Sequence, residues 1–493
     1  MQKLLAFDYG ASSGRAILGK YDGEKLLLEE MHRFTNDPVM VSGTFHWDIL
    51  RLFHEMKQGI TKCNTTGNGD FASIGVDTWG VDFGLLGSSG ELLGNPVHYR
   101  DERNNGMMDE AFRMVPKKEI YQLTGTQFMS FNTLFQLLAM KQSHSPILEK
   151  AKTLLLTPDL LNYFLTGEKT SEFSIASTTQ MLDWNTMDWA GDLLDRIGIP
   201  KGILTEIIHA GSVMGNVSSR VCEELRISRR VPVVAVAGHD TESAMMAVPA
   251  AGERFAYLSS GTWSLLGMEL PGPIINDTTY QYDFTNEGGY GGKTSLHKNI
   301  MGLWIYQECK RTWEKEGETL SFDQMEAEGT HSEPFAAIID PDNELFLAPG
   351  NMPNKIRDFC VRTGQQAPQT KGAIVRCIME SLAMKYRKTL EELEEITGAK
   401  IPVLHIVGGG CRNAMLCRFT ANAIGRPVIA GPVEATAIGN IICQLLALGE
   451  IRSLDEARRM VKQSFPTTEY LPAEADAWND AYLSFKKICS KQI

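Results

Sequence analysis

The first third of the chain shows the hydrophobic and polar patterning of an α/β protein. Three runs rich in apolar residues, residues 4–9, 15–21 and 25–34, predict a meander of three strands. Large apolar residues then recur at helical spacing over residues 45–63, which predicts a helix. Residues 72–77 predict the next strand, and residues 83–93 predict a hairpin that turns on a Ser-Ser-Gly sequence.

Near the middle of the chain, residues 231–237 form an uninterrupted apolar run, which is typical of a strand buried on both faces. This run ends at Gly238, and residues 242–247 predict a helix. Asp240 is therefore expected where a buried strand ends and a helix begins. In open α/β sheets this is the usual position of a ligand.

The second half of the chain repeats this organisation. A hairpin is predicted around Gly261, a helix over residues 299–315, and a long amphipathic helix whose apolar residues run from 374 to 393. Gly398 provides a glycine cap for that helix. Residues 403–407 predict a strand that leads into three glycines and a helix over residues 413–423, and further helices are expected after residue 455.

Two Ser-Gly turns, within residues 6–15 and 258–264, open the two halves of the chain in the same way. Glycine lets a backbone come close to a ligand, and serine adds a donor, a combination that suits phosphate. The turns indicate a duplicated fold that holds nucleotide phosphates. At 493 residues the chain exceeds one core, so we expect domains of residues 1–248 and 249–493, with the boundary near residues 249–252.

Composition excludes several classes of function. The chain is 43% hydrophobic and 22% charged, with a net charge of −12 and no cluster of Lys and Arg, which argues against nucleic-acid and anionic-membrane partners. No apolar run approaches the length of a membrane span, and the strand expected from Leu4 leaves no room for a secretory signal. Nine scattered cysteines without a C-x-x-C pair predict reduced thiols, no zinc site and a cytoplasmic location. Cys360 and Cys377 would meet if a strand and a helix align there, but a disulfide between them is not expected.

Asp240 is the strongest catalytic candidate. Phosphoryl transfer needs positioning, neutralised charge and one group that receives the proton of the attacking hydroxyl. A carboxylate at a helix N-terminus remains ionised and is able to accept that proton. The alternative is that Asp240 caps the helix, and the two roles are compatible. For its neighbour His239, a substrate contact and a structural hydrogen bond stay open.

Asp8 and Arg15 flank the first Ser-Gly turn. A carboxylate immediately before a phosphate-binding turn suits Mg²⁺, which is bound through oxygen ligands and water, although Asp8 also suits local hydrogen bonding to the backbone. Arg15 follows Gly14 and is expected to face the phosphates rather than to be a solvated surface charge.

Two further segments allow two interpretations each, and a third resembles a motif that it does not complete. Residues 77–83 end a strand with carboxylates, a hydroxyl and aromatic rings, which suits a sugar, although Trp79 and Phe83 also fit a core. The glycines 408–410 fit either a nucleotide contact or a tight strand-to-helix turn. Residues 291–294 resemble the end of a P-loop, but Glu287 stands where its first glycine belongs, so that motif is excluded.

Taken together, these residues resemble the FGGY-type carbohydrate kinases, members of the superfamily that includes actin, hexokinase and Hsp70. The resemblance rests on the paired hairpins, Asp8-x-Gly10, Gly238-His239-Asp240, and residues 431–435 with Gly439. It is supported by residues 77–83, 256–266, 299–304, 339–342 and 405–413, and it spans almost the whole chain. The chain departs from many members at residues 99–103, where the family's Trp-x-Asp-x-Arg begins with Tyr, which weakens the transfer of sugar contacts there.

The resemblance implies two ribonuclease-H-like lobes with ATP, Mg²⁺ and a ketose in a central cleft. It assigns roles residue by residue: Asp240 as proton acceptor; Ala11, Ser12, Ser13, Gly14, Arg15, Thr262, Gln307 and Gly409 for ATP; and Gly80, His239, Asp240, Thr241 and Asn299 for the sugar.

Other functions stay open at this stage. The family resemblance implies a small-molecule ketose and ATP as partners and leaves the identity of the ketose unresolved, and the chain is expected to be a monomer or a small homo-oligomer. Because the Ser-Gly hairpins also fit an actin-like ATPase or chaperone, sugar-independent or polymer-dependent ATP turnover would indicate that class. Formation of a sugar phosphate would exclude a non-catalytic sugar sensor.

Overall fold

The computed structural model describes residues 1–250, 252 and 254–490, which form two compact units. Unit 1 comprises Met1–Pro249, Glu269–Leu296 and Ala435–Ser464. Unit 2 comprises the described residues of Ala250–Met268, His297–Glu434 and Phe465–Ile493. Ala251, within the expected boundary region, lies outside the described residues.

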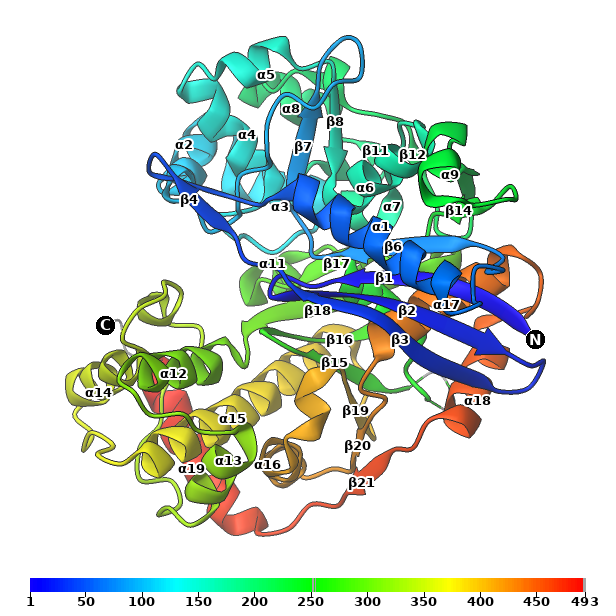
Figure 1. Ribbon diagram of the computed structural model, residues 1–493. Coiled ribbons are helices and arrows are strands. Elements are labelled where there is room, and N and C mark those ends of the chain that lie inside the picture. Colours follow the sequence, from blue (N-terminus) through cyan, green and yellow to red (C-terminus); the bar gives the residue numbers. More distant parts are fainter. Residues whose placement is uncertain (251, 253, 491–493) are drawn as a thin grey trace. The chain divides into compact units, whose positions relative to one another are not determined.

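Unit 1 is built on a six-stranded sheet of order β13-β14-β6-β1-β2-β3. Its strands are β1 (Gln2–Tyr9), β2 (Ser13–Tyr21), β3 (Leu26–Thr35), β6 (Ile74–Thr78), β13 (Val213–Asn216) and β14 (Pro232–Val234). The first three strands are the predicted antiparallel meander, seen side by side in blue in Figure 1. β6 runs parallel to β1, and β14 runs parallel to β6.

The second sheet has seven strands in the order β17-β18-β16-β15-β19-β20-β21. They are β15 (Ala256–Ser260), β16 (Trp263–Leu270), β17 (Thr285–Gly288), β18 (Thr294–Met301), β19 (Leu404–Val407), β20 (Val428–Ala430) and β21 (Thr468–Tyr470). β15 and β16 form an antiparallel hairpin, while β19 and β20 continue in parallel. A core of five strands has the order 3-2-1-4-5 in both sheets, as β3-β2-β1-β6-β14 in the first and β18-β16-β15-β19-β20 in the second, which is the duplication that the two turns predict.

The remaining strands of unit 1 are short. They are β4 (Val39–Val41), β5 (Thr44–His46), β7 (Phe83–Leu86), β8 (Thr153–Leu156), β9 (Ser171–Glu172), β10 (Leu182–Asp183), β11 (Asp188–Trp189) and β12 (Ile207–Ile208).

Helices pack against the sheets. In unit 1 they are α1 (Ile49–Thr65), α2 (Met107–Met114), α3 (Lys117–Thr124), α4 (Thr133–Gln142), α5 (Pro146–Lys150), α6 (Thr157–Thr166), α7 (Phe173–Ser177), α8 (Gly191–Ile197), α9 (Ser219–Leu225), α10 (Asp240–Met246), α11 (Asp277–Tyr282), α17 (Ala435–Ala447) and α18 (Leu454–Ser464). In unit 2 they are α12 (Trp304–Lys315), α13 (Phe322–Thr330), α14 (Met352–Arg362), α15 (Lys371–Thr397), α16 (Ala414–Ile424) and α19 (Ala475–Cys489).

Three local predictions differ from the structure. The helix expected from residue 45 begins at Ile49, because the Asp48 side chain caps it by accepting a hydrogen bond from the Arg51 N–H. The hairpin expected over residues 83–93 includes the antiparallel bridge of Leu86 to Leu92, but it does not account for the whole pairing of β7, which also pairs with β8, far along the chain. The helix expected from Asn299 begins at Trp304, since residues 294–301 form β18.

All nine cysteines are free thiols, including Cys360 and Cys377. None of the helices in the described part of the chain combines the length and the apolar character that crossing a membrane requires.

Candidate active site

Three carboxylates gather at one edge of the unit 1 sheet. Asp8 lies in β1 and stands opposite Asp77 of β6 in the parallel pairing, and Asp240 follows the next strand, β14. Because β1, β6 and β14 are parallel neighbours, their carboxyl ends meet at the same edge (Figure 1). The sequence-based placement of Asp240 between a buried strand and a helix is confirmed.

Asp77 is fully buried among polar partners. Asn440 Nδ2 of α17 donates to its Oδ2 at 2.6 Å. The other oxygen, Oδ1, is buried and has no hydrogen-bond donor in the part of the chain that the structure describes. Burial, together with the negative charge of Asp8, raises the pKa of Asp77 well above its ordinary value. An oxygen of this kind fits a divalent cation, because Mg²⁺ takes carboxylate ligands.

Asp8 forms an ion pair with Arg15, whose Nη2 lies 3.1 Å from the Asp8 Oδ2. The two residues are cross-strand partners in the β1–β2 hairpin. Gly14, next to Arg15, leaves no room for a side chain, because an added Cβ would lie 2.2 Å from the Phe34 ring. The turn itself is closed by hydrogen bonds from the Gly10 N–H to the Ser13 carbonyl and from the Asn36 N–H to the Ser12 carbonyl.

Asp240 is the first residue of α10. The N-cap position, which the alternative interpretation gives to Asp240, is occupied by His239. The Asp240 side chain keeps 30% of its surface exposed, so a substrate can reach the carboxylate. Burial of the surrounding site raises the pKa of Asp240, whereas the positive charge of His239 and hydrogen bonds from Thr241 act in the opposite direction.

His239 is held by Glu287, a residue of β17. Its Nδ1 lies 2.5 Å from the Glu287 Oε2, and its Nε2 lies 3.5 Å from the Asp240 Oδ1. Burial disfavours the charged ring, but the Glu287 carboxylate outweighs burial and raises the pKa of His239 to about 9. The sequence did not indicate that Glu287 contacts His239. It showed Glu287 only as the residue that breaks the P-loop pattern.

The predicted sugar segment is organised by Asp82. The indole N–H groups of Trp47 and Trp79 donate to its Oδ2 at 2.6 and 2.9 Å, and Gln136 Nε2 donates to its Oδ1 at 3.0 Å. Trp79 and Phe83 are 6% and 5% exposed, which supports their interpretation as core residues. Asp82 was not singled out from the sequence, because its partners come from distant segments.

Gly80 lies at a tight turn beside this cluster. The Asp82 N–H donates to the Gly80 carbonyl at 2.9 Å, and Val81 between them has a φ of 66°, the features of a γ-turn. A β-branched residue rarely adopts this conformation. Thr178 Oγ1 accepts from the Val81 N–H, and Thr133 Oγ1 donates to the Val81 carbonyl, so the strained turn is fixed from both sides.

Unit 2 brings together some of the residues assigned to ATP. Thr262, in the turn between β15 and β16, donates to the Gln307 Oε1 of α12 at 3.4 Å. A Cβ on Gly410 would lie 1.9 Å from the Ser260 Oγ, so the glycine turn packs closely on the hairpin, whereas a Cβ on Gly409 would meet open space. Asn299 lies in β18.

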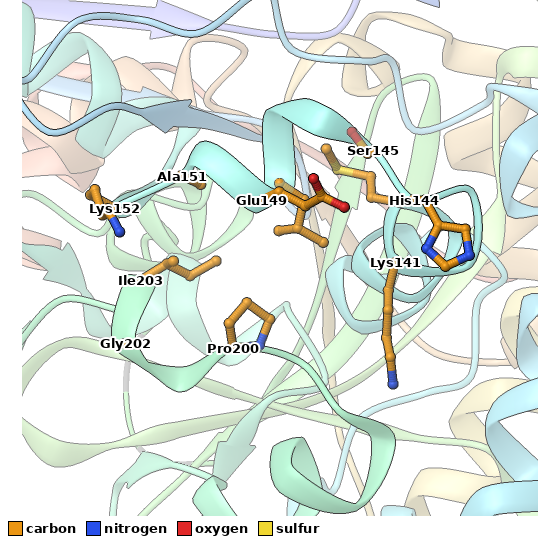
Figure 2. A pocket seen from close by; sticks show the side chains of 11 residues that line it. Lys141, His144, Ser145, Glu149, Ala151, Lys152, Pro200, Gly202 and Ile203 are labelled. Atoms are coloured by element: carbon orange, nitrogen blue, oxygen red, sulfur yellow. The ribbon is translucent and has the colours of Figure 1, made fainter.

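A surface pocket lies in a different part of unit 1. Figure 2 shows that it is formed by the end of α4, by α5 and by the segment around Pro200. Its lining residues are Met140, Lys141, His144, Ser145, Leu148, Glu149, Ala151, Lys152, Pro200, Gly202 and Ile203. They include none of the residues assigned to catalysis, ATP, sugar or metal.

Comparison with known protein families matches both halves of the chain. Residues 3–247 match the N-terminal domain of the FGGY family of carbohydrate kinases, and residues 256–448 match the C-terminal domain of that family.

Individual relatives agree along the full length. The chain is 43% identical over 485 residues to a rhamnulokinase of Bacteroides thetaiotaomicron, covering 98% of this chain and 99% of that one. It is 42% identical over 466 residues to a rhamnulokinase of Oceanobacillus iheyensis, covering 94% and 97%.

Among solved structures, the ligand-bound xylulose kinase of Lactobacillus acidophilus matches with a TM-score of 0.82 at 16% identity, covering 99% of this chain and 98% of that one. The Plasmodium falciparum glycerol kinase with ADP matches with a TM-score of 0.77 at 17% identity, covering 100% and 99%. These likenesses confirm the expected fold class, an α/β protein with two ribonuclease-H-like domains.

Proposed function

The chain belongs to the FGGY family of carbohydrate kinases, and from this premise we propose that it transfers the γ-phosphoryl group of ATP to the 1-hydroxyl of L-rhamnulose. The observation that carries the proposal is the partly exposed Asp240 carboxylate, which stands at the strand edge where the family's proton acceptor is expected. The full-length similarity to rhamnulokinases supports this choice of sugar over L-fuculose or xylulose.

In the proposed step, Asp240 accepts the proton of the 1-hydroxyl. The hydroxyl oxygen forms a bond to the γ-phosphorus, the bond from that phosphorus to the bridging oxygen breaks, and ADP leaves with the electron pair. Asp240 is suited to this role because His239 opposes the effect of burial on its pKa and so favours the ionised form.

Asp8, with Asp77 beside it, would hold Mg²⁺. The buried Oδ1 of Asp77 and the carboxylate of Asp8 on the neighbouring strand are the donor types that this ion prefers. When bound, Mg²⁺ neutralises negative charge on the phosphates of ATP. Arg15 now pairs with Asp8, and we expect it to turn toward the phosphates when a nucleotide is bound.

The remaining assignments follow the family resemblance. Ala11, Ser12, Ser13, Gly14, Thr262, Gln307 and Gly409 are proposed to bind ATP, and Gly80, His239, Thr241 and Asn299 are proposed to bind the sugar. The fixed γ-turn at Val81 supports the role of Gly80, because it holds one backbone conformation without help from a ligand. A cytoplasmic location is also proposed, which agrees with nine free thiols.

The proposal is tested by ³¹P NMR of reactions that contain ATP, Mg²⁺ and one ketose at a time. We expect a sugar 1-phosphate signal with L-rhamnulose, and weaker or no signals with L-fuculose and D-xylulose. A faster reaction with either of these two sugars would reassign the substrate within the family. ATP turnover that needs no sugar would instead favour the actin-like alternative.

A further inference from the structure

We propose that Glu287 is a positioning residue for the phosphoryl transfer: it holds His239 as a cation whose Nε2 faces Asp240, and thereby keeps the proton acceptor ionised. The inference rests on the proposed function, in which Asp240 receives the proton of the sugar hydroxyl.

The geometry that carries this inference is a row of three side chains in unit 1. The Glu287 Oε2 lies 2.5 Å from the His239 Nδ1, and the His239 Nε2 lies 3.5 Å from the Asp240 Oδ1. Glu287 and His239 are 3% and 8% exposed, whereas the Asp240 side chain keeps 30% of its surface exposed. The row therefore runs from a buried carboxylate, through a buried ring, to a carboxylate that a substrate can reach.

Glu287 is held in place through its neighbours in β17. The Asn286 N–H donates to the Gly125 carbonyl at 2.8 Å, and the Gly288 N–H donates to the Ser177 Oγ at 2.9 Å. A Cβ on Gly288 would lie 2.2 Å from the Phe173 ring, so β17 packs directly on α7. Backbone contacts on both sides thus fix the position of Glu287 before any ligand binds, as a positioning residue requires.

Asp240 needs such support because its surroundings favour the protonated acid. Burial raises its pKa, and the negative charge of Glu287 acts in the same direction. Only an ionised carboxylate accepts a proton, and the positive charge of His239 is the largest influence that lowers the pKa of Asp240. The charged groups that face His239 are Glu287 from β17 and Asp240 and Glu242 from α10.

Glu242 provides a matched control. It lies on α10, is buried, and accepts a hydrogen bond from the Ser295 Oγ at 2.8 Å. Burial and the charge of Glu287 raise the pKa of Glu242 well above its ordinary value, and Glu242 ranks behind Glu287 and Asp240 among the carboxyl groups that raise the pKa of His239. Glu242→Gln therefore removes a weaker influence on His239, whereas Glu287→Gln removes the carboxylate that lies 2.5 Å from its Nδ1.

The first measurement is the titration of His239 by NMR of protein labelled at the histidine Cε1 position, with the His239 signal assigned as the one lost in His239→Gln. In the wild type we expect a pKa of about 9. In Glu287→Gln it should fall by about 1–3 pH units, the usual effect of losing one adjacent opposite charge. Glu242→Gln should lower it less than Glu287→Gln does, and Glu287→Asp should restore most of the shift.

The second measurement is the pH dependence of kcat/KM for the ketose. In Glu287→Gln the His239 ring becomes neutral above its lowered pKa, so kcat/KM should fall, by up to about tenfold, between that pKa and about 9, and the two profiles should agree at lower pH, where the ring is charged in both proteins. The KM for ATP should change little. A loss that is uniform across pH would indicate a merely structural role and overturn the inference. A wild-type His239 that titrates near 6.5 would overturn it as well, even if no variant folds.

The two proposals fail in different ways. If the wild type phosphorylates no ketose, the proposed function fails, and the catalytic part of this inference fails with it. If the wild type phosphorylates the ketose but the titration of His239 and the pH profile of kcat/KM are the same in Glu287→Gln, only the inference about Glu287 fails.

Discussion

The Asp240 carboxylate combines two properties that a proton acceptor needs, access to the substrate and a nearby positive charge. Asp240→Asn preserves the shape of the side chain but cannot accept a proton, so kcat should fall by about 10²–10⁴-fold, the usual scale of a lost general base. Because the variant keeps the ATP-binding segments, ATP affinity measured by isothermal titration calorimetry should change little. Turnover close to that of the wild type would contradict the assignment.

Asp82 makes the stability of the protein depend on pH. Burial outweighs the hydrogen bonds from Trp47, Gln136 and Trp79 and raises the pKa of Asp82 to about 6 in the folded state. The folded pKa lies above the unfolded one, so this group contributes stability at low pH that is lost as the pH rises through about 6. Between pH 5 and 7 the wild type should lose about 1 kcal/mol of unfolding free energy relative to Asp82→Asn. Urea denaturation at both pH values measures this difference, and equal slopes with pH would contradict it.

Among the helices, α10 and α17 meet at a glycine that is part of the family motif. A Cβ on Gly439 would lie 1.7 Å from the Ser243 carbonyl oxygen, so any side chain there must push α10 away from α17. Because α10 begins at Asp240, we expect Gly439→Ala to lower both the unfolding free energy, by about 1–3 kcal/mol, and kcat.

Gly202→Ala is the matched control for this change, since a Cβ on Gly202 meets no atom within 4 Å. Its unfolding free energy in urea and its kcat should stay close to those of the wild type. If Gly439→Ala is less stable but has an unchanged kcat, the packing of α10 on α17 does not determine the position of Asp240, and this prediction is contradicted.

Elements with a strong local signal were predictable from the sequence. The meander and the glycine-capped α15 follow from periodicity and capping, because their determinants lie within each segment. The partner of β7 was not predictable, since β8 is joined to it only through tertiary packing. The start of α1 depends on a single side-chain cap, Asp48, so periodicity alone does not fix it.

For the whole molecule, the repeated Ser-Gly turns were enough to predict a duplicated fold, and five strands of each sheet share one order. Asp8 and Asp240 were found because each is adjacent to a strand end. Glu287 and Asp82 were not identified individually, because their contacts with His239 and Trp47 join residues distant in the chain. The roles of the predicted ATP, sugar and metal residues stay predictions until ligands are tested.

The behaviour of the complete enzyme toward water separates a sugar kinase from an actin-like ATPase. Water is also a possible acceptor of the phosphoryl group, but it lacks the binding contacts that would place a ketose hydroxyl beside Asp240. ADP formation at saturating Mg·ATP should therefore rise at least about tenfold when L-rhamnulose is added. A coupled ADP assay measures both rates, and Asp240→Asn in the same assay reports any contaminating ATPase. Equal rates with and without the ketose would place this chain among sugar-independent ATPases, whatever its similarity to sugar kinases.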